Sequence, residues 1–227
     1  MNHFSESNTA LVIPFYNERR FLPLLFSRIP ANIAGIIFID DGSSDGSAEV
    51  IPRNDSRIFL LSHSENRGKG AALRTGMLKS LESGFSATIT LDADLQHPPE
   101  IVPDLVNLLN LHQVVIGTRN FTFAEMPFER VLSNIITSLI ISRKSGKRIK
   151  DSQSGYRAFR NDILRQILPE SDDYIAESEM LIKAGRLNLN LGELPIPALY
   201  GEETSKINNR QVIWGFIRKI IFRRKFL

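Results

Sequence analysis

The sequence contains no cysteine among its 227 residues. Disulfide bonds and thiolate metal sites are therefore excluded, and a reducing compartment is compatible with this composition. Long apolar runs are also missing. The longest apolar-leaning stretch, residues 131–141, is interrupted by serine, asparagine and threonine, and it falls short of the roughly 18 residues that a membrane-spanning helix needs. The N-terminal ten residues lack the basic start and apolar core of a secretory signal. We therefore expect a cytoplasmic protein that does not cross the membrane.

A spread of basic charge is missing as well. The formal net charge is +3, but residues 211–227 carry five Lys and Arg and no acidic residue. Removing these five charges leaves −2 on the remaining 210 residues. The basic character belongs to the C-terminal tail, whereas a nucleic-acid-binding protein is expected to carry a broad basic patch with reading elements. We therefore expect no nucleic-acid partner.

The sequence has an ordinary globular composition with 42% hydrophobic residues. The chain is long enough for one domain with a substantial core. Short apolar runs alternate with helical segments in the first half. Strands are predicted at 10–14, 35–40, 58–62, 88–91 and 114–117, and helices at 19–28, 47–51 and 71–83. This alternation predicts parallel β-α-β units in a doubly wound sheet. Beyond residue 120 we expect helices at 129–143 and 174–186, a loop and short strand within 149–159, and a strand at 191–197 on the same sheet. The predicted fold class is α/β.

The stretch 88–101, TITLDADLQHPPEI, carries the clearest functional signal. A buried strand opens into Asp92 and Asp94, and residues two apart on an extended chain point to the same side. Two converging carboxylates repel each other unless a cation lies between them. Their oxygens, with that of Gln96, suit Mg²⁺ or Mn²⁺, whose other ligands are waters or substrate phosphates. The alternative is a solvated acidic turn, and a single Asp would favour it.

Further polar clusters follow the other predicted strands, at residues 15–18, 40–46 and 65–70. In doubly wound sheets ligands bind beyond the carboxyl ends of the strands, so the clusters together predict a nucleotide site. The turn 67–70, RGKG, offers glycines that let backbone approach a ligand, a cation, and a helix N-terminus that favours anions. It lacks the P-loop spacing. The alternatives are that 40–45 only caps a helix and that 67–70 is a solvated turn.

Four of these motifs occur in a set order: PFYNE at 14–18, IDDGSSDG at 39–46, NRGKGAA at 66–72 and DADLQHPP at 92–99. Together they resemble family 2 glycosyltransferases of the GT-A fold, a Rossmann-like fold, and especially the dolichyl-phosphate mannose synthase-like branch that glycosylates polyprenyl phosphates. Later segments extend the resemblance over roughly residues 10–220: GTR at 117–119, DSQSGYR at 151–157, ESEMLIK at 177–183, and 193–206.

The resemblance implies a metal-dependent inverting glycosyltransferase with Mg²⁺ or Mn²⁺ as cofactor. Its catalytic domain would cover 8–210, with a nucleotide-binding half at 8–120 and an acceptor half at 121–210. Asp92, Asp94 and Gln96 would hold the metal, and Asp94, Arg119 and Asp151 would be catalytic. The donor nucleotide would be bound by Pro14, Tyr16, Asn17, Glu18, Asp41, Lys69 and Asp92. Thr118, where the family often has serine, is a mild departure. The donor, GDP-mannose or a UDP-hexose, stays open, because the segment after residue 200 resembles relatives with varied sugars and acceptors.

The acceptor decides whether the reaction needs a general base. A phosphate monoester is already largely ionised at neutral pH, so a polyprenyl phosphate requires cations. The candidates are Arg119, Arg130, Ser205 and Lys206. A sugar hydroxyl in a cell-envelope glycan would instead require a base, for which Asp151 is the candidate. Its alternative is a structural cap of its loop, and that of Arg130 is an exposed helix charge. Glu177 and Glu179 do not share a helix face, so at most one of them faces the site.

The tail, 211–227, mixes apolar and basic residues and predicts an amphipathic helix as far as about residue 221. Such helices lie on anionic membrane surfaces, so we expect a peripheral protein at the inner face of the membrane. Packing of this helix on the domain is the alternative. A non-catalytic nucleotide-binding protein and a nucleotidyltransferase remain further possibilities, although the latter would be expected to carry a Gly-rich loop after the first strand. The sequence does not predict the oligomeric state.

Overall fold

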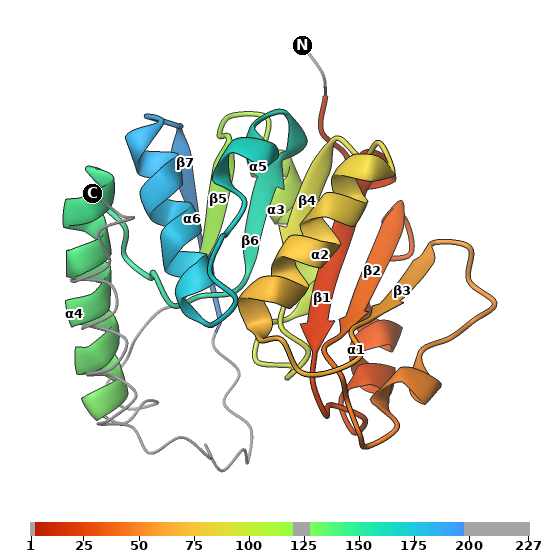
Figure 1. Ribbon diagram of the computed structural model, residues 1–227. Helices are drawn as coiled ribbons and strands as arrows, with labels where there is room; N and C mark the ends of the chain where they lie inside the picture. Colours follow the sequence, from red (N-terminus) through yellow and green to blue (C-terminus); the bar gives the residue numbers. More distant parts are fainter. Residues whose placement is uncertain (1–2, 120–127, 198–227) are drawn as a thin grey trace.

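The computed structural model describes residues 3–119 and 128–197, without the side chains of 128–130. Its centre is a seven-stranded sheet in the order β3-β2-β1-β4-β6-β5-β7 (Figure 1). The strands are β1 (Thr9–Phe15), β2 (Gly35–Asp40), β3 (Ile58–Ser62), β4 (Ala87–Thr90), β5 (Val114–Arg119), β6 (Arg157–Arg160) and β7 (Leu191–Ile196). β6 is antiparallel to both of its neighbours, and every other pairing is parallel. The prediction of a mostly parallel α/β sheet is confirmed.

Helices cover both faces of this sheet (Figure 1). They are α1 (Leu22–Arg28), α2 (Lys69–Glu82), α3 (Val102–Leu108), α4 (Phe128–Ser145), α5 (Asn161–Ile167) and α6 (Ile175–Arg186), with short 3-10 turns η1 (Glu6–Asn8), η2 (Ser47–Val50) and η3 (Pro99–Ile101). Leu11 and Ile13 of β1 join one core cluster with side chains of α1 and α3, whereas Ala10 and Val12 join another with Ala72 of α2. Every residue of β1 is buried, as expected for a strand with helices on both faces.

Three local predictions need correction. The strand within 149–159 is confined to Arg157–Arg160 and runs against its neighbours, and a helix, α5, follows it directly. The helix predicted at 19–28 begins only at Leu22, with Pro23 in its first turn, where proline is tolerated. The segment predicted as a helix at 47–51 is a single 3-10 turn.

Helix α4 stands at the edge of the molecule beside α6 and has an unusual distribution of side chains (Figure 1). The side facing the protein is largely polar: Asn134 and Ser138 are buried and hydrogen-bond to Asp151 and Ser152. Val131 and Ile141 are buried, but four other large apolar side chains are exposed to solvent. They are Leu132, Ile135, Ile136 and Leu139, which are 38–58% exposed. Their spacing of three and four residues places them on one side of the helix.

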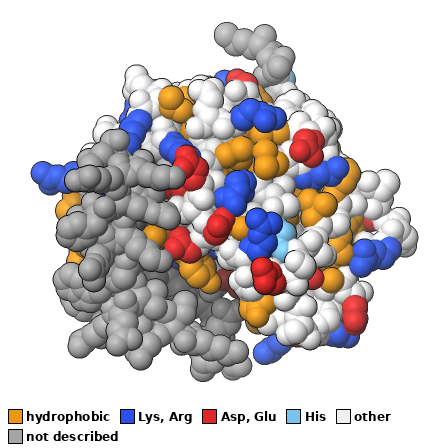
Figure 2. Space-filling model, in the orientation of Figure 1, with side chains coloured by type: hydrophobic (Ala, Val, Ile, Leu, Met, Phe, Trp, Pro, Cys, Tyr) orange, Lys and Arg blue, Asp and Glu red, His pale blue; other side chains and the backbone are white. Residues whose placement is uncertain are grey.

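Each helix in the described part of the chain is either too short or too polar to span a bilayer. On the face of the molecule drawn in Figure 2, Lys and Arg side chains are interspersed with Asp and Glu rather than gathered in one patch. The division of the domain at residue 120 stays a prediction. The predicted tail, 211–227, lies outside the described residues.

Candidate active site

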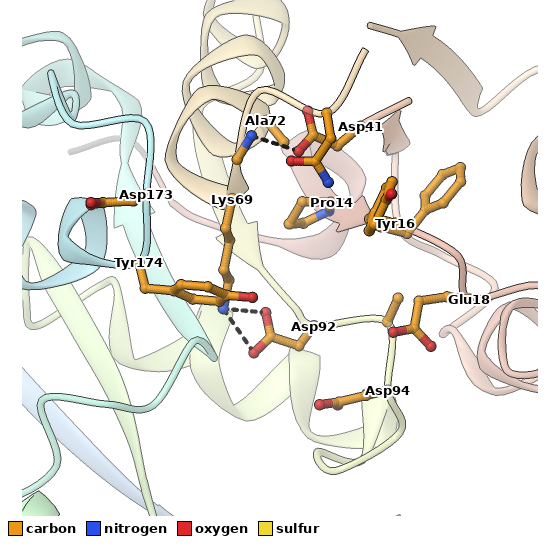
Figure 3. A pocket seen from close by; sticks show the side chains of 14 residues that line it. Pro14, Tyr16, Glu18, Asp41, Lys69, Ala72, Asp92, Asp94, Asp173 and Tyr174 are labelled. Atoms are coloured by element: carbon orange, nitrogen blue, oxygen red, sulfur yellow. Dashed lines mark hydrogen bonds and ion pairs between the residues drawn. The ribbon is translucent and has the colours of Figure 1, made fainter. Parts of the chain in front are cut away.

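A pocket of about 440 Å³ opens at the carboxyl ends of β1, β2 and β4 (Figure 3). The end of β1 contributes Tyr16, and the chain after β4 contributes Asp92 and Asp94. Tyr174, which precedes α6, faces Tyr16 across the pocket in the view of Figure 3. The lining residues are Pro14, Phe15, Tyr16, Glu18, Asp41, Asn66, Gly68, Lys69, Ala72, Asp92, Ala93, Asp94, Asp173 and Tyr174.

Asp41 fixes one wall of this pocket. Its carboxylate accepts hydrogen bonds from the backbone N–H groups of Arg67 at 3.0 Å and Gly68 at 2.8 Å. His63 Nδ1 lies 2.7 Å from the same carboxylate, and His63 Nε2 lies 3.0 Å from the hydroxyl of Thr75. Asp41 is only 3% exposed, so burying its charge depends on these partners. The carboxylate therefore positions the turn that leads into α2.

Gly68 makes this turn possible. Its φ of 97° lies in a region that side chains rarely adopt, and a Cβ there would collide with the carbonyl oxygen of Asp172. Glycine is the residue that reaches this conformation without a steric cost. As a result, α2 begins at Lys69, directly on the pocket wall.

Lys69 is the centre of an ion cluster at the floor of the pocket (Figure 3). Its Nζ lies 2.8 Å from Oδ1 and 3.0 Å from Oδ2 of Asp92, and 3.2 Å from Oε1 of Glu177 in α6. Burial acts to lower the pKa of Lys69, but the charges of Asp92 and Glu177 outweigh it and raise that pKa above its ordinary value. Burial likewise acts to raise the pKa of Asp92, and Lys69 outweighs it and holds that pKa low. The cluster is therefore an ammonium ion between two carboxyl side chains.

Two residues of the segment 151–157 support this cluster from behind. A Cβ on Gly155 would lie 2.6 and 2.9 Å from the Asp92 carboxylate oxygens and 2.9 Å from Oε1 of Glu177. Only a glycine allows the two carboxyl groups to come this close to the backbone. Arg157 is 1% exposed and donates to the carbonyl oxygens of Glu177 at 2.6 Å, Ser154 at 2.8 Å and Ser152 at 2.9 Å. Burial lowers the pKa of Arg157, and these bonds tie the segment to α6.

The acidic pair predicted to bind metal lines the same pocket. Asp92 and Asp94 both face it, and Asp94 Oδ1 accepts the backbone N–H of Gln96 at 3.1 Å. Within residues 3–119 and 128–197, no group of three or more His, Cys, Asp or Glu converges as a complete metal site. Two carboxylates that leave further coordination positions to phosphate oxygens and water form the kind of donor set that Mg²⁺ and Mn²⁺ accept. The residues present therefore fit a divalent cation that arrives together with a phosphorylated ligand.

Arg119 and Asp151 form a second, more deeply buried ion pair. Arg119 Nε donates to Oδ2 at 2.8 Å and Nη2 to Oδ1 at 2.9 Å, while Asn134 adds a bond at 3.1 Å. Asp151 is completely buried. Burial acts to raise the pKa of this carboxyl, and the hydrogen bonds and charge of Arg119 outweigh it and hold the pKa below its usual range. Both groups are thus ionised, and the geometry favours a carboxylate that positions Arg119 over one that accepts a substrate proton.

His97 lies next to the predicted metal ligands but behind the pocket surface. It is 3% exposed and stacks on Tyr156 with ring centroids 5.7 Å apart, and its Nδ1 has no hydrogen-bond partner among the described residues. Burial lowers its pKa to about 4. The imidazole is therefore neutral at pH 7 and packs as an aromatic ring.

Of the nine residues predicted to bind nucleotide or metal, seven line the pocket, and Asn17 and Gln96 do not. Asn17 joins two loops instead: its side-chain oxygen accepts from Ser44 N, and its backbone N–H donates to Ser43 Oγ, both at 2.9 Å. Arg119 and Asp151 also lie outside the lining. The predicted acceptor residues Ser205 and Lys206 and the side chain of Arg130 lie outside the described part of the chain.

Four residues of the site were not assigned a role from sequence. His63 follows the end of β3, so the strand-end argument that identified Asp41 would have found it. Glu177 faces Lys69 while Glu179 accepts the backbone N–H groups of residues 170 and 171, so one acid of the pair faces the site. Asp173 and Tyr174 reach the pocket through the packing of α6, for which the sequence gives no signal.

Comparison with known proteins identifies the family. The model of glycosyl transferase family 2 matches residues 10–168. A UDP-N-acetylglucosamine–dolichyl-phosphate N-acetylglucosaminyltransferase of Methanococcus voltae is 30% identical over 94% of this chain and 93% of its own length. An undecaprenyl-phosphate mannosyltransferase of Micrococcus luteus is 31% identical over 82% of this chain and 81% of its own.

Among solved structures, the glucosyl-3-phosphoglycerate synthase of Mycobacterium tuberculosis, crystallised with Mn²⁺, UDP and glucosyl-3-phosphoglycerate, superimposes with a TM-score of 0.71. The match covers 94% of this chain and 77% of that one at 20% identity. At this identity the likeness supports the fold alone, and it confirms the GT-A prediction. Since the family model covers most of the chain and a relative matches it almost from end to end, this protein belongs to glycosyl transferase family 2.

Proposed function

We propose that this glycosyltransferase moves a sugar from a nucleotide-sugar to a polyprenyl phosphate at the inner surface of a membrane. The observation that carries the proposal is the pocket in which Asp41, Lys69, Asp92 and Asp94 meet at the carboxyl edge of the sheet, where such folds bind nucleotides. The two relatives described above are named for transfer to dolichyl and undecaprenyl phosphate.

The pocket divides into regions suited to the parts of a nucleotide-sugar. Pro14 and Tyr16 provide apolar and aromatic surface for the base, and Tyr16 is 46% exposed at the opening. Asp41 lies near Pro14 in the view of Figure 3, beside the turn to α2, and is placed to hold that turn against the base or ribose. Lys69, at the N-terminus of α2, supplies the positive charge for the diphosphate.

Asp92 and Asp94 would hold a Mg²⁺ or Mn²⁺ ion, which when bound neutralises charge on the departing nucleoside diphosphate. The fit rests on the two carboxylates that face the same pocket and on the room left for phosphate oxygens. Gln96 contributes through its backbone N–H to Asp94, which orients that carboxylate. Asp92 also connects this end of the pocket to Lys69.

A phosphate acceptor agrees with the burial of Asp151. This candidate base is inaccessible to solvent and is paired with Arg119. Transfer with inversion is a single in-line displacement, in which the acceptor phosphate oxygen attacks the anomeric carbon and the nucleoside diphosphate leaves. Because a phosphate monoester is ionised at neutral pH, no carboxylate has to remove a proton. Asp151 then positions the guanidinium of Arg119 through Nε and Nη2, and the positive charge of Arg119 would attract the acceptor phosphate. Arg130, Ser205 and Lys206 remain predicted partners of this phosphate.

The lipid acceptor also accounts for the exposed apolar side of α4. Four Leu and Ile side chains of that helix are exposed to solvent. Its last turn and the five residues after it carry Arg143, Lys144, Lys147, Arg148 and Lys150. Apolar side chains next to a group of cations favour an anionic lipid surface. We therefore place α4 against the membrane, with the predicted tail helix as a second contact.

Transfer of radiolabelled sugar from UDP-N-acetylglucosamine and from GDP-mannose tests the proposal, with a short-chain polyprenyl phosphate and with free hexoses as acceptors. The expected product is a lipid-linked sugar that forms only with Mg²⁺ or Mn²⁺ present and does not form in Asp94→Asn. Transfer to free hexoses alone would favour the hydroxyl-acceptor alternative. Nucleotide binding without transfer to either acceptor class would overturn the enzymatic assignment for these donors.

A further inference from the structure

The ion cluster of Lys69, Asp92 and Glu177 has a consequence for how cation and nucleotide bind. This consequence rests on the proposed function. We propose that Lys69 is an internal counter-ion that shields Asp92 in the nucleotide-free protein, and that it turns toward the donor diphosphate when the nucleotide binds. Divalent cation and nucleotide would then bind cooperatively, because the diphosphate exposes a carboxylate that the cation needs.

The geometry of Asp92 is the first observation. Both of its oxygens lie within 3.0 Å of the same ammonium nitrogen. A divalent cation on either oxygen would lie close to the Lys69 charge. Like charges at such distances repel strongly in a partly buried site, and the side chains of Lys69 and Asp92 are only 18% and 24% exposed. Lys69 and a divalent cation therefore compete for this carboxylate.

Glu177 is the second observation, since it gives Lys69 a partner that does not depend on Asp92. Its Oε1 lies 3.2 Å from Nζ, and its backbone is held by the buried Arg157. When Asp92 turns to a cation, Glu177 still offsets the ammonium charge. The lysine side chain can then pivot about this contact toward the pocket it already lines, instead of leaving the site.

The location of Lys69 in the fold is the third observation. It is the first residue of α2, follows a turn fixed by Asp41, and faces the same cavity as Asp94. A diphosphate in this cavity provides several anionic oxygens in exchange for the two of Asp92. The exchange keeps the lysine paired in both states, so its energetic cost is small compared with that of exposing an unpaired buried charge.

Mn²⁺ binding to the intact chain, measured from the electron paramagnetic resonance signal of free Mn²⁺, tests this inference without any turnover. In the wild type we expect Mn²⁺ affinity to rise about tenfold or more when UDP or GDP is added. In Lys69→Met, Mn²⁺ should bind about tenfold tighter than in the wild type without nucleotide. The gain in Mn²⁺ affinity on adding nucleotide should shrink by the same factor, and the part that comes from direct phosphate ligands should remain. In Glu177→Gln, Lys69 has only Asp92 as a partner, so nucleotide-free Mn²⁺ affinity should fall.

Arg67→Met is the matched control, because Arg67 is an exposed cation two residues away on the same turn. If only the loss of a nearby positive charge matters, Mn²⁺ affinity changes equally with and without nucleotide. The ratio of these two affinities then stays as in the wild type. Lys69→Arg keeps the charge and should keep most of the ratio. If Lys69→Met does not fold, as judged by circular dichroism, Glu177→Gln tests the inference instead. Its nucleotide-free Mn²⁺ affinity should then be lower than that of the wild type, and an unchanged or higher affinity would overturn the role.

Two results separate this inference from the proposed function. If the wild type binds Mn²⁺ and nucleotide together but Lys69→Met leaves nucleotide-free Mn²⁺ affinity unchanged or weaker, the counter-ion role is wrong and the enzyme assignment stands. A shift in Arg67→Met equal to that in Lys69→Met would also overturn the role. If the wild type binds no Mn²⁺ in the presence of either nucleotide, the metal-dependent function itself fails.

Discussion

Arg119 and Asp151 hold each other through two parallel hydrogen bonds of 2.9 Å or less, in a place where Asp151 has no contact with solvent. Asp151 also accepts the side chain of Asn134 and the backbone N–H of Gln153. The pair thus joins the end of β5 to α4 and to the segment 151–157. A carboxylate with this many donors keeps its charge and its position.

Replacing Asp151 by Asn should therefore cost more stability than an ordinary ion-pair deletion. The substitution leaves Arg119 buried beside a neutral amide, and breaking a buried pair costs about 3–5 kcal/mol. Glu100→Gln is the control, since its pair with Arg28 is largely solvent-exposed and such pairs contribute about 1 kcal/mol or less. Urea unfolding of both variants measures the difference. Equal losses in the free energy of unfolding would show that the Arg119–Asp151 pair stabilises the protein no more than an exposed pair does.

Much of the site was predictable because its residues follow the carboxyl ends of parallel strands. Asp41, Asp92 and Asp94 each follow a parallel strand, and parallel strands bring their carboxyl ends to one edge. Lys69 was predicted from the glycines around it. These residues do meet in one pocket.

What the sequence did not predict depends on contacts between distant segments. The reversed direction of β6 is set by pairing with β4 and β5, and the four residues RAFR carry no sign of direction. Tyr174 lines the pocket and Glu177 pairs with Lys69 only because α6 packs beside α2. Arg119 and Asp151 were both identified, but their pairing was not, since 32 residues separate them.

The bond from Asp41 to the turn before α2 should control nucleotide affinity. In Asp41→Asn, an amide group faces backbone donors at Arg67 and Gly68 and the ring of His63. At least one buried donor then loses its acceptor, and the turn shifts. We expect the Kd for UDP or GDP to rise roughly tenfold, as measured by calorimetry. Glu65→Gln, an exposed acid on the same turn, should leave it unchanged. Equal Kd values in the two variants would contradict this role.

His97 should make the stability of the metal-free protein depend on pH. Its pKa falls from 6.5 to about 4 through burial, so between these values the unfolded chain binds a proton that the folded chain does not. Stability is therefore lost as the pH falls through this interval, by up to about 3 kcal/mol. His97→Phe keeps the stacking on Tyr156 and removes the titration. The stability of this variant relative to the wild type should increase from about pH 7 to about pH 4. Chemical unfolding at a series of pH values measures this difference, and a constant difference between pH 7 and pH 4 would contradict the prediction.

The apolar side of α4 should determine binding to lipid. Ile135→Ser with Leu139→Ser removes two exposed side chains that are 53% and 58% accessible and changes no buried contact of α4. We expect binding to vesicles of phosphatidylglycerol and phosphatidylcholine to fall about tenfold in a sedimentation assay, with unchanged thermal stability. Leu111→Ser alters a leucine that is 69% exposed elsewhere on the surface and serves as control. If both variants bind vesicles like the wild type, α4 is not the membrane contact.

Gly155 tests whether the close approach of Asp92 and Glu177 is needed. A methyl group at this position would lie within 2.9 Å of three carboxylate oxygens, so Gly155→Ala must push both acids away from the backbone. Overpacking of this kind costs about 1–3 kcal/mol, and it also moves Asp92 relative to Asp94. We expect a lower melting temperature together with weaker Mn²⁺ binding in the presence of nucleotide. Gly84→Ala is a suitable comparison, because in the part of the chain that the structure describes no atom lies within 4 Å of a Cβ at that position. Its positive φ of 77° causes backbone strain, so it should lower stability while leaving Mn²⁺ affinity unchanged. A Gly155→Ala protein that lost stability but bound Mn²⁺ normally would show that the cluster tolerates a wider separation of its two acids.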